Sequence, residues 1–263
     1  PRSCERSRHR HGAPRRHSLT AVVRKVALVT GGARRVGAAI VRSFAERGYH
    51  LVLHHGHSPD EAQRLATDLE TEHGVRVLVV QEDLADPAAP ARVVQAAVSA
   101  FGALDVVVSS ASVMEWRDFD AVTPEDWART EAINLRAPFF LMQAAGRAMP
   151  DGGCIIQIAD HLAHETGFPR LMPHQITKAA LGQLVRAVAD HLAPRVRVNA
   201  VSPGLVLAPD DLSAAATARF LRDVPLARSG TPDELVEAIH YLVSASYVTG
   251  TVLRVDGGRH LRR

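Results

Sequence analysis

The chain has 263 residues, of which 46% are hydrophobic and 22% are charged, so it can bury one sizeable core and is most simply one domain. Its two cysteines, Cys4 and Cys154, lie far apart, which argues against a disulfide framework or a cysteine-rich metal site and favours a reducing compartment. No apolar run approaches the ~20 residues that span a bilayer. We therefore expect a cytoplasmic protein without a membrane partner.

The basic charge is concentrated at the start of the chain. Residues 1–20 hold six arginines and one acid, a subtotal of +5 that leaves about −2 for the rest of a chain whose net charge is +3. Residues 1–22 are predicted to be a disordered basic tail, and 23–263 the folded domain. The tail could be a nucleic-acid arm, a transit peptide or an over-long translation start; we favour no function. A nucleic-acid partner is not expected, because the basic excess ends with the tail.

The stretch Lys25–Gly48 has the pattern of a phosphate-binding turn. Val26–Val29 is apolar enough for a buried strand, and the glycine-bearing segment Thr30–Gly37 follows it. Helical spacing of apolar residues then continues to Gly48, a plausible helix end. Such a strand, turn and helix aim backbone N–H groups at a phosphate, although an ordinary strand–turn–helix would look similar.

The same alternation continues to the carboxyl end. Further strands are expected at residues 50–54, 75–80, 105–109, 154–159, 195–201 and 252–255. Between them, helices are expected from a capping box at Ser58 to about residue 72, and at 87–101, 123–149, 176–192 and 231–244. Seven strands alternating with helices predict a doubly wound α/β domain, with a parallel sheet covered on both faces.

Several motifs, in this order and spacing, resemble the short-chain dehydrogenase/reductase family from Lys25 to about Gly258. They are the glycine turn, Asp83-Leu84, Asn134, Lys178, RVNAVSPG at 197–204, YVTG at 247–250 and VDGG at 255–258. The resemblance implies a Rossmann-like seven-stranded sheet, a nicotinamide cofactor and a homotetramer or homodimer. It also implies that cofactor is held by Gly31, Val36, Gly37, Asp83, Leu84, Ser110, Ala111, Lys178, Pro203, Gly204 and Val206.

Within the family, the turn is similar to the pteridine reductase branch, which includes dihydromonapterin reductases. Arg35 stands where the family's usual turn has glycine, His54–Ser58 is similar to a segment of that branch, and Asp160 occupies the place of the catalytic serine. No acid closes the second strand to accept a ribose 2′-hydroxyl. Donors suited to a 2′-phosphate stand there instead and favour NADP(H), namely Arg34, Arg35, His57 and Ser58.

The candidate catalytic residues depart from the family pattern. His174 stands four residues before Lys178, at the position where the family has a tyrosine that protonates the substrate. In the family, the lysine binds the nicotinamide ribose, and an asparagine, which corresponds to Asn134 here, supports a water relay. His174 is either a general acid or a helix-start residue in a decayed site. One extra residue in the spacing leaves Asp160 and His161 as alternatives at the serine position. Met114 replaces the aromatic residue that stacks pterin, which leaves the substrate open.

The leading hypothesis is an NADPH-dependent reductase of a C=O or C=N bond in a small, pterin-like or other cyclic metabolite. Its catalytic residues would be His174, Lys178, Asp160 and Asn134. The alternatives are a non-redox lyase, dehydratase or isomerase, or a non-catalytic NADP-binding protein. The segment Leu205–Arg222 would form the substrate lid. No metal site is expected, because the remaining histidines lack ligand spacing, and most of them are predicted to lie at the surface; they include His54, His55, His164 and His191.

Overall fold

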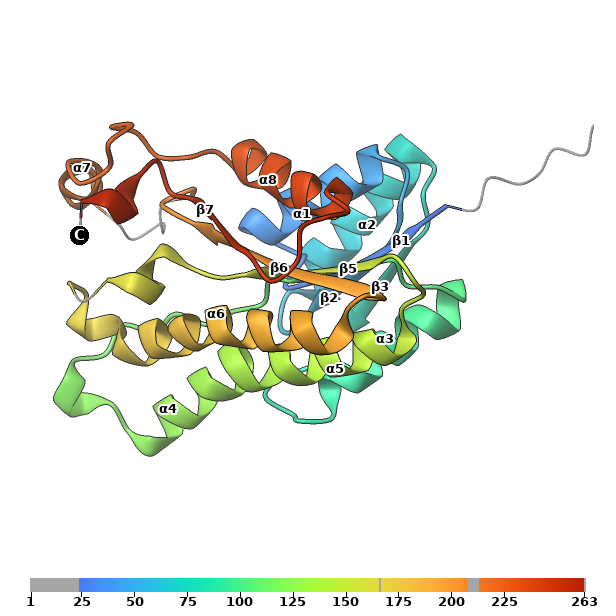
Figure 1. Ribbon diagram of the computed structural model, residues 1–263, viewed down its shortest axis with the longest axis horizontal. Coiled ribbons are helices and arrows are strands. Elements are labelled where there is room, and N and C mark those ends of the chain that lie inside the picture. The colour runs from blue at the N-terminus through green and yellow to red at the C-terminus, as the bar shows by residue number, and fades with distance from the viewer. Residues whose placement is uncertain (1–23, 166, 208–212, 263) are drawn as a thin grey trace, which may run out of the picture.

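The computed structural model describes residues 24–165, 167–207 and 213–262, so the predicted tail lies outside the described residues. Seven parallel strands form one sheet in the order β3-β2-β1-β4-β5-β6-β7 (Figure 1). The predicted fold class and all seven strands are confirmed, with ends shifted by at most two residues. The strands are β1 Val26–Thr30, β2 His50–His55, β3 Val77–Gln81, β4 Val106–Ser109, β5 Gly153–Ile158, β6 Val196–Pro203 and β7 Val252–Val255.

The central strands are apolar along their whole length because helices cover both faces of the sheet. Figure 1 shows three helices on one face, α1 Arg35–Glu46, α2 Pro59–His73 and α8 Pro232–Ser244. The other face carries α3 Ala89–Phe101, α5 Ala137–Ala148 and α6 Met172–Leu192. Alternate residues of β1 therefore enter two separate cores: Ala27 and Val29 pack with the first helix layer, and Val26 and Leu28 with the second.

The predicted helix over 123–149 is interrupted at its centre. It begins as α4 Pro124–Glu131 behind a capping box of Thr123 and Asp126, passes through a π-helical turn at Ala132–Arg136, and continues as α5. A single π turn inside a helix often marks a functional site. Here that turn carries Asn134.

The capping box predicted at Ser58 is wrong. Pro59 does open α2, but the Ser58 side chain makes no capping hydrogen bond. The Ser58 backbone N–H, which a capping box would use, instead donates to His55 Nδ1 at 3.3 Å. Within the predicted lid, the structure adds a short helix, α7 Ala214–Leu221, while residues 208–212 lie outside the described residues.

Candidate active site

The carboxyl ends of β1 and β4 form the crevice in which a doubly wound sheet places its ligand. The chain leaves β1 toward β2 on one side and returns through β4 on the other, so the loops diverge at this point. Thr30 Oγ1 joins the two ends by accepting from the backbone N–H of Ser110 at 3.0 Å and of Ala111 at 3.2 Å. The predicted cofactor residues after β4 therefore lie beside the glycine turn.

Two glycines of the turn are required by close packing. Gly31 has a φ of +66°, and a Cβ atom there would lie 2.9 Å from the Ala111 Cα. At Gly37 a Cβ would lie 2.0 Å from the Gly31 carbonyl oxygen. Among the described residues no side chain caps the amino terminus of α1, which suits a phosphate at that position. The turn thus fits the pyrophosphate of a dinucleotide.

Arg35 keeps the backbone conformation that favours glycine. Its φ is +53°, in the left-handed region, which costs a side-chain-bearing residue roughly 1–2 kcal/mol. Its guanidinium donates to the Leu207 carbonyl at 2.9 Å, at the start of the predicted lid. Arg34 is exposed and lies 3.9 Å from Glu61, His57 is exposed, and Ser58 is buried. The four predicted 2′-phosphate donors therefore all follow β1 or β2, and Arg34 reaches the first turn of α2, which begins directly after Ser58.

The other predicted cofactor residues line the same edge of the sheet. Leu84 and Ala111 belong to one small apolar cluster, which suits a flat base. Asp83 accepts from the Ala85 N–H at 2.9 Å and thereby shapes the loop after β3. Gly204 follows β6, and a Cβ there would lie 2.8 Å from the Asp256 Cα. Pro203 and Val206 flank it.

His174 and Asp160 are in direct contact at the carboxyl end of β5. His174 Nε2 donates to Asp160 Oδ2 at 3.0 Å, and its Nδ1 lies 3.0 Å from the Val113 carbonyl oxygen. Each ring nitrogen therefore has an oxygen acceptor within hydrogen-bond distance. The His174 residue is 3% exposed, so the Asp160 side chain, at 19%, is the more accessible partner.

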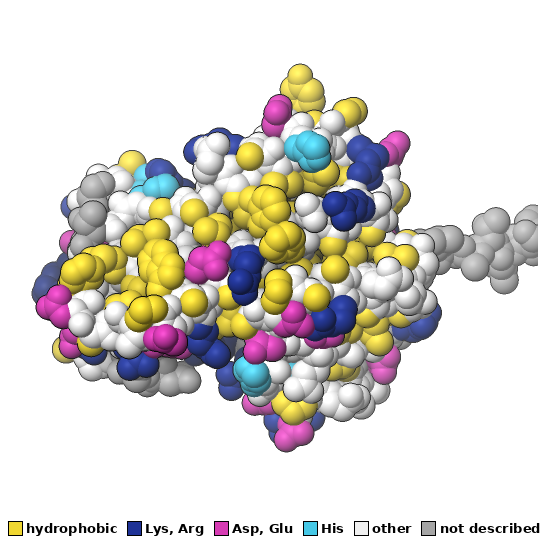
Figure 2. Space-filling model, turned by 90° about the horizontal axis from the view of Figure 1, so that it is seen from below, with side chains coloured by type: hydrophobic (Ala, Val, Ile, Leu, Met, Phe, Trp, Pro, Cys, Tyr) yellow, Lys and Arg dark blue, Asp and Glu magenta, His cyan; other side chains and the backbone are white. Residues whose placement is uncertain are grey.

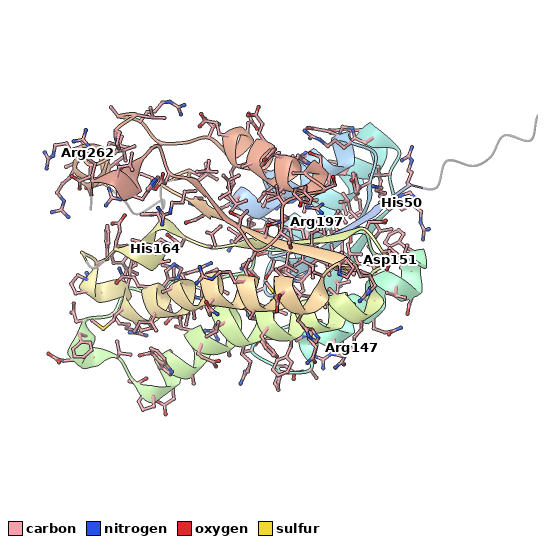
Figure 3. All side chains as sticks on the ribbon, viewed as in Figure 1. His50, Arg147, Asp151, His164, Arg197 and Arg262 are labelled. Atoms are coloured by element: carbon pink, nitrogen blue, oxygen red, sulfur yellow. The ribbon has the colours of Figure 1, made fainter. Side chains whose placement is uncertain are left out.

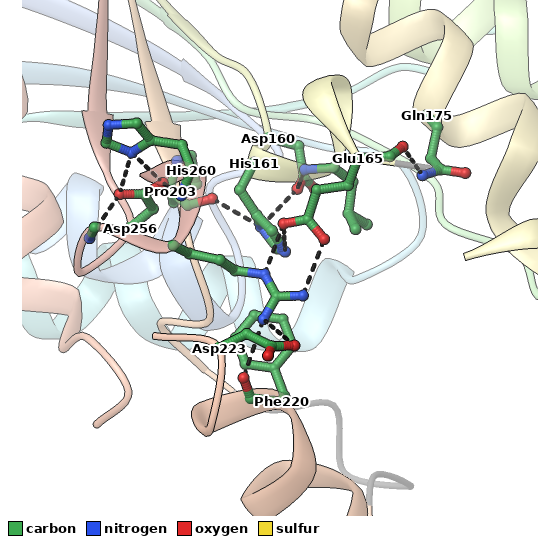
Figure 4. A network of polar contacts seen from close by, with 12 residues as sticks. Asp160, His161, Glu165, Gln175, Pro203, Phe220, Asp223, Asp256 and His260 are labelled. Carbon is green, nitrogen blue, oxygen red and sulfur yellow. Dashed lines mark hydrogen bonds and ion pairs between the residues drawn. The ribbon is translucent and has the colours of Figure 1, made fainter. Parts of the chain in front are cut away.

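Asp160, rather than His161, faces His174. Burial opposes ionisation of Asp160, but hydrogen bonds from His161 and His174 outweigh burial and hold the pKa of this carboxyl far below its ordinary value. His161 lies behind it, with Nδ1 3.0 Å from Asp160 Oδ1 and 3.1 Å from the Pro203 carbonyl oxygen (Figure 4). The carboxylate thus stands between two imidazoles.

Asn134 contacts His174 of this pair, and Lys178 lies one helical turn after His174 on α6. The Asn134 side chain accepts from the Val113 N–H and donates to the Val113 carbonyl, each at 2.8 Å, and its Nδ2 lies 3.4 Å from His174 Nδ1. Lys178 is buried and donates to the Ile158 carbonyl at 3.1 Å. Burial lowers the pKa of Lys178, and Asp160 partly opposes that effect. The four predicted catalytic residues therefore do come together.

The comparisons with known proteins agree with this geometry. A family profile described as enoyl-(acyl carrier protein) reductase matches residues 31–260. Versicolorin reductase 1 of Aspergillus parasiticus is 32% identical over 253 residues, which cover 89% of this chain and 95% of that protein. The chain belongs to the short-chain dehydrogenase/reductase family. The predicted enzyme class, a nicotinamide-dependent oxidoreductase, is thereby confirmed.

Two solved structures of the family are similar over nearly the whole fold. One is a blue fluorescent protein from a metagenomic library in complex with NADPH, 35% identical, with a TM-score of 0.84 over 89% of this chain and 97% of that one. The other is a short-chain dehydrogenase of Burkholderia cenocepacia J2315 in complex with NADP, 31% identical, with a TM-score of 0.85 over 90% and 99%. Both therefore extend the family assignment to the three-dimensional fold.

His54 is a site residue that the sequence analysis missed. It and His55 are buried at 1% and 3% exposure, so both are exceptions to the prediction that most of the remaining histidines lie at the surface. His54 Nδ1 accepts from the Gly31 N–H at 3.3 Å, and Nε2 lies 3.0 Å from the Glu82 carbonyl oxygen. Its position at the end of a buried strand, next to the turn, was the only available signal.

Among residues 24–165, 167–207 and 213–262, no helix has the length and apolar character to cross a membrane. Within the same ranges, no three His, Cys, Asp or Glu side chains converge in a way that could hold a metal ion.

Proposed function

We propose that this protein is an NADPH-dependent reductase of a C=O or C=N bond in a small metabolite, with a proton supplied by the His174–Asp160 pair. The observation that carries the proposal is the 3.0 Å contact between His174 and Asp160. His174 lies on α6, four residues before the buried Lys178. Bound nicotinamide would supply the hydride. Lys178 would hold the ribose beside it, and Asn134 would keep the segment after β4 and His174 in register.

The division of labour in the pair follows from exposure and charge. Because the low pKa of Asp160 keeps it a carboxylate, the transferable proton belongs on the His174 side of the contact. Asp160 is the more exposed member and would orient both imidazole and substrate. A cyclic, pterin-like substrate is the finer form of this proposal, and its support is Asp160 together with Arg35 in the turn.

NADP(H) is the proposed cofactor form. No acid closes β2 to accept a ribose 2′-hydroxyl, and Arg34 and Arg35 supply guanidinium groups that suit a phosphate dianion. We expect NADPH to bind at least tenfold more tightly than NADH, which corresponds to about 1.4 kcal/mol. Arg35→Ala should remove most of that preference in calorimetric titrations.

One observation favours a second candidate function, a nucleotide-binding protein without turnover. His174 is 3% exposed and both of its nitrogens already have protein partners. In that case the pair would be structural. A screen of carbonyl and pterin substrates, followed by loss of NADPH absorbance, separates the two candidates.

The decisive variant is His174→Phe. If the pair transfers the proton, kcat should fall by on the order of 10²–10⁴, the usual value of a general acid, while NADPH binding is retained. His191→Phe, the same change at an exposed position of α6, is the matched control and should keep full activity. Tight NADPH binding without turnover in the wild type would favour the second candidate instead.

A further inference from the structure

A hollow lies on the α6 face of β6 and β7, next to the active-site pair, and Asp160 and Lys178 line its larger part. A cavity of about 530 Å³ is bounded by the turn η3 His161–His164, α6 and the two strands, and a smaller one of about 160 Å³ adjoins it. Both are lined by His164, Ser202, Arg254 and His260. Figure 3 shows η3, with His164 at its end, above the amino-terminal part of α6. The glycine turn and the residues after β4 do not line either cavity.

Two buried polar atoms face the smaller cavity without a hydrogen-bond partner among the described residues. They are Ser202 Oγ, in a residue that is 1% exposed, and His161 Nε2. A buried polar group left unpaired costs about 1–3 kcal/mol, so native proteins rarely retain one. The volume exceeds the ~30 Å³ share of one water. A polar ligand in the cavity would satisfy both atoms.

The charges around the hollow leave a positive group without a counterion. Asp160 already faces His174, Asp256 faces His260 at 2.8 Å, and Glu165 faces Arg259 at 2.6 Å. In contrast, the Arg254 guanidinium makes no hydrogen bond or ion pair with any residue that the structure describes.

The charge of Arg254 also affects the neighbouring His164 side chain. Burial, then the charge of Arg254, then that of His260 lower its pKa below the ordinary value. The charge of the exposed Arg254 on β7 therefore acts on His164 at the end of η3. A bound anion would neutralise that charge, and Arg254 offers the fork of donors that phosphate and carboxylate prefer.

We propose that these joined cavities bind a small oxyanion, a phosphate or a carboxylate, through the Arg254 guanidinium and the Ser202 hydroxyl. Asp160 and Lys178 line the larger cavity, so the site adjoins the active-site pair, but the glycine turn of the cofactor crevice lines neither cavity. The proposal does not rest on the proposed reductase function. The same hydrogen-bond donors would recognise a phosphate or a carboxylate. Inorganic phosphate and succinate therefore serve as the two probes that show which kind of anion the cavities bind.

The test is a calorimetric titration of the full chain with each probe, at an ionic strength held constant with sodium chloride. Arg254→Gln should weaken binding of the preferred probe by about 10- to 100-fold, the worth of a charge-assisted hydrogen bond. Ser202→Ala should weaken it in the same direction. Arg64→Gln removes the same charge from an exposed position on α2 and should change nothing.

Arg35→Gln guards against phosphate binding at the cofactor turn. If that change abolishes phosphate binding while Arg254→Gln retains it, the anion belongs to the turn and the proposal is overturned. It is equally overturned if neither probe gives a saturable heat with the wild-type protein, since the cavities then hold only water. Both readouts are independent of NADPH turnover.

Discussion

His54 shows how one buried side chain fixes a functional turn. Its Nδ1 accepts from the Gly31 N–H, so in the neutral ring the proton must be on Nε2, which faces the Glu82 carbonyl. Burial is the largest effect on this ring and lowers its pKa from 6.5 to about 4. A protonated ring would lose the Gly31 contact, so the turn depends on neutral His54.

This dependence predicts a specific loss of stability in acid. Because the folded pKa lies below the unfolded one, the unfolded chain binds the proton first, and the free energy of unfolding falls as pH drops from 6.5 toward 4. The full effect is on the order of 3 kcal/mol. Urea unfolding at both ends of that window should show a smaller fall for His54→Gln than for the wild type. Exposed His191→Gln should match the wild type, and equal slopes in all three proteins would contradict the assignment.

The sequence predicted the site residues that belong to recognisable motifs, and it missed those whose role depends on how the chain folds. Asp160, His174 and Lys178 were predicted together because their spacing on consecutive elements is short. The choice between Asp160 and His161 could not be made, because a one-residue ambiguity is resolved only by where the η3 turn begins. His54 was missed because a histidine at a strand end has no distinctive pattern.

The carboxyl-terminal turn, the η3 segment and helix α7 are joined by a buried ion pair. Arg259, 1% exposed, donates two hydrogen bonds to the Glu165 carboxylate at 2.6 and 2.9 Å (Figure 4). Its guanidinium also lies 3.7 Å from the centre of the Phe220 ring and donates to the Phe220 carbonyl at 3.0 Å. One side chain therefore attaches the predicted lid to the loop that follows Asp160.

Breaking this pair should loosen the lid as well as destabilise the fold. Glu165→Gln leaves the buried Arg259 charge with only Asp223, 3.9 Å away, as a counterion, and breaking a buried pair costs about 3–5 kcal/mol. Urea unfolding measures the loss, and limited proteolysis should show faster cleavage within residues 205–222. The double variant Glu165→Leu/Arg259→Met removes both charges and should recover part of the stability. Glu234→Gln changes a partly exposed carboxylate whose partner Arg228 is exposed, and it should cost much less stability.

At the element scale, periodicity placed every strand and most helices, because both faces of the sheet are covered and the strands are uniformly apolar. It could not reveal the π turn at Ala132–Arg136, since one extra residue in a turn barely changes the apolar pattern. The capping box at Ser58 failed because the His55 ring, three residues earlier at the end of β2, accepts from the Ser58 N–H.

The whole molecule leaves an apolar surface uncovered on the helix layer of α4, α5 and α6. Trp127, Phe139 and Ile176 are 41%, 44% and 49% exposed on these three helices. Figure 2 views the molecule from that side and shows hydrophobic side chains gathered among the charged ones. Exposed apolar patches of this kind commonly mark protein interfaces. We propose that this face joins copies of the chain into the dimer or tetramer expected from sequence.

The oligomer gives the last prediction. Analytical ultracentrifugation should show a dimer or tetramer, and Phe139→Glu should reduce its mass, because a carboxylate in an apolar interface would lose its hydration without gaining a partner. Since Phe139 is 44% exposed in the monomer, the change should leave the unfolding midpoint of the separated subunit almost unaltered. Tyr247→Glu is the matched control: this fully exposed aromatic residue precedes β7, outside the α4–α6 face. If Tyr247→Glu dissociates the oligomer and Phe139→Glu does not, the copies associate through the β7 edge and the proposed face is wrong.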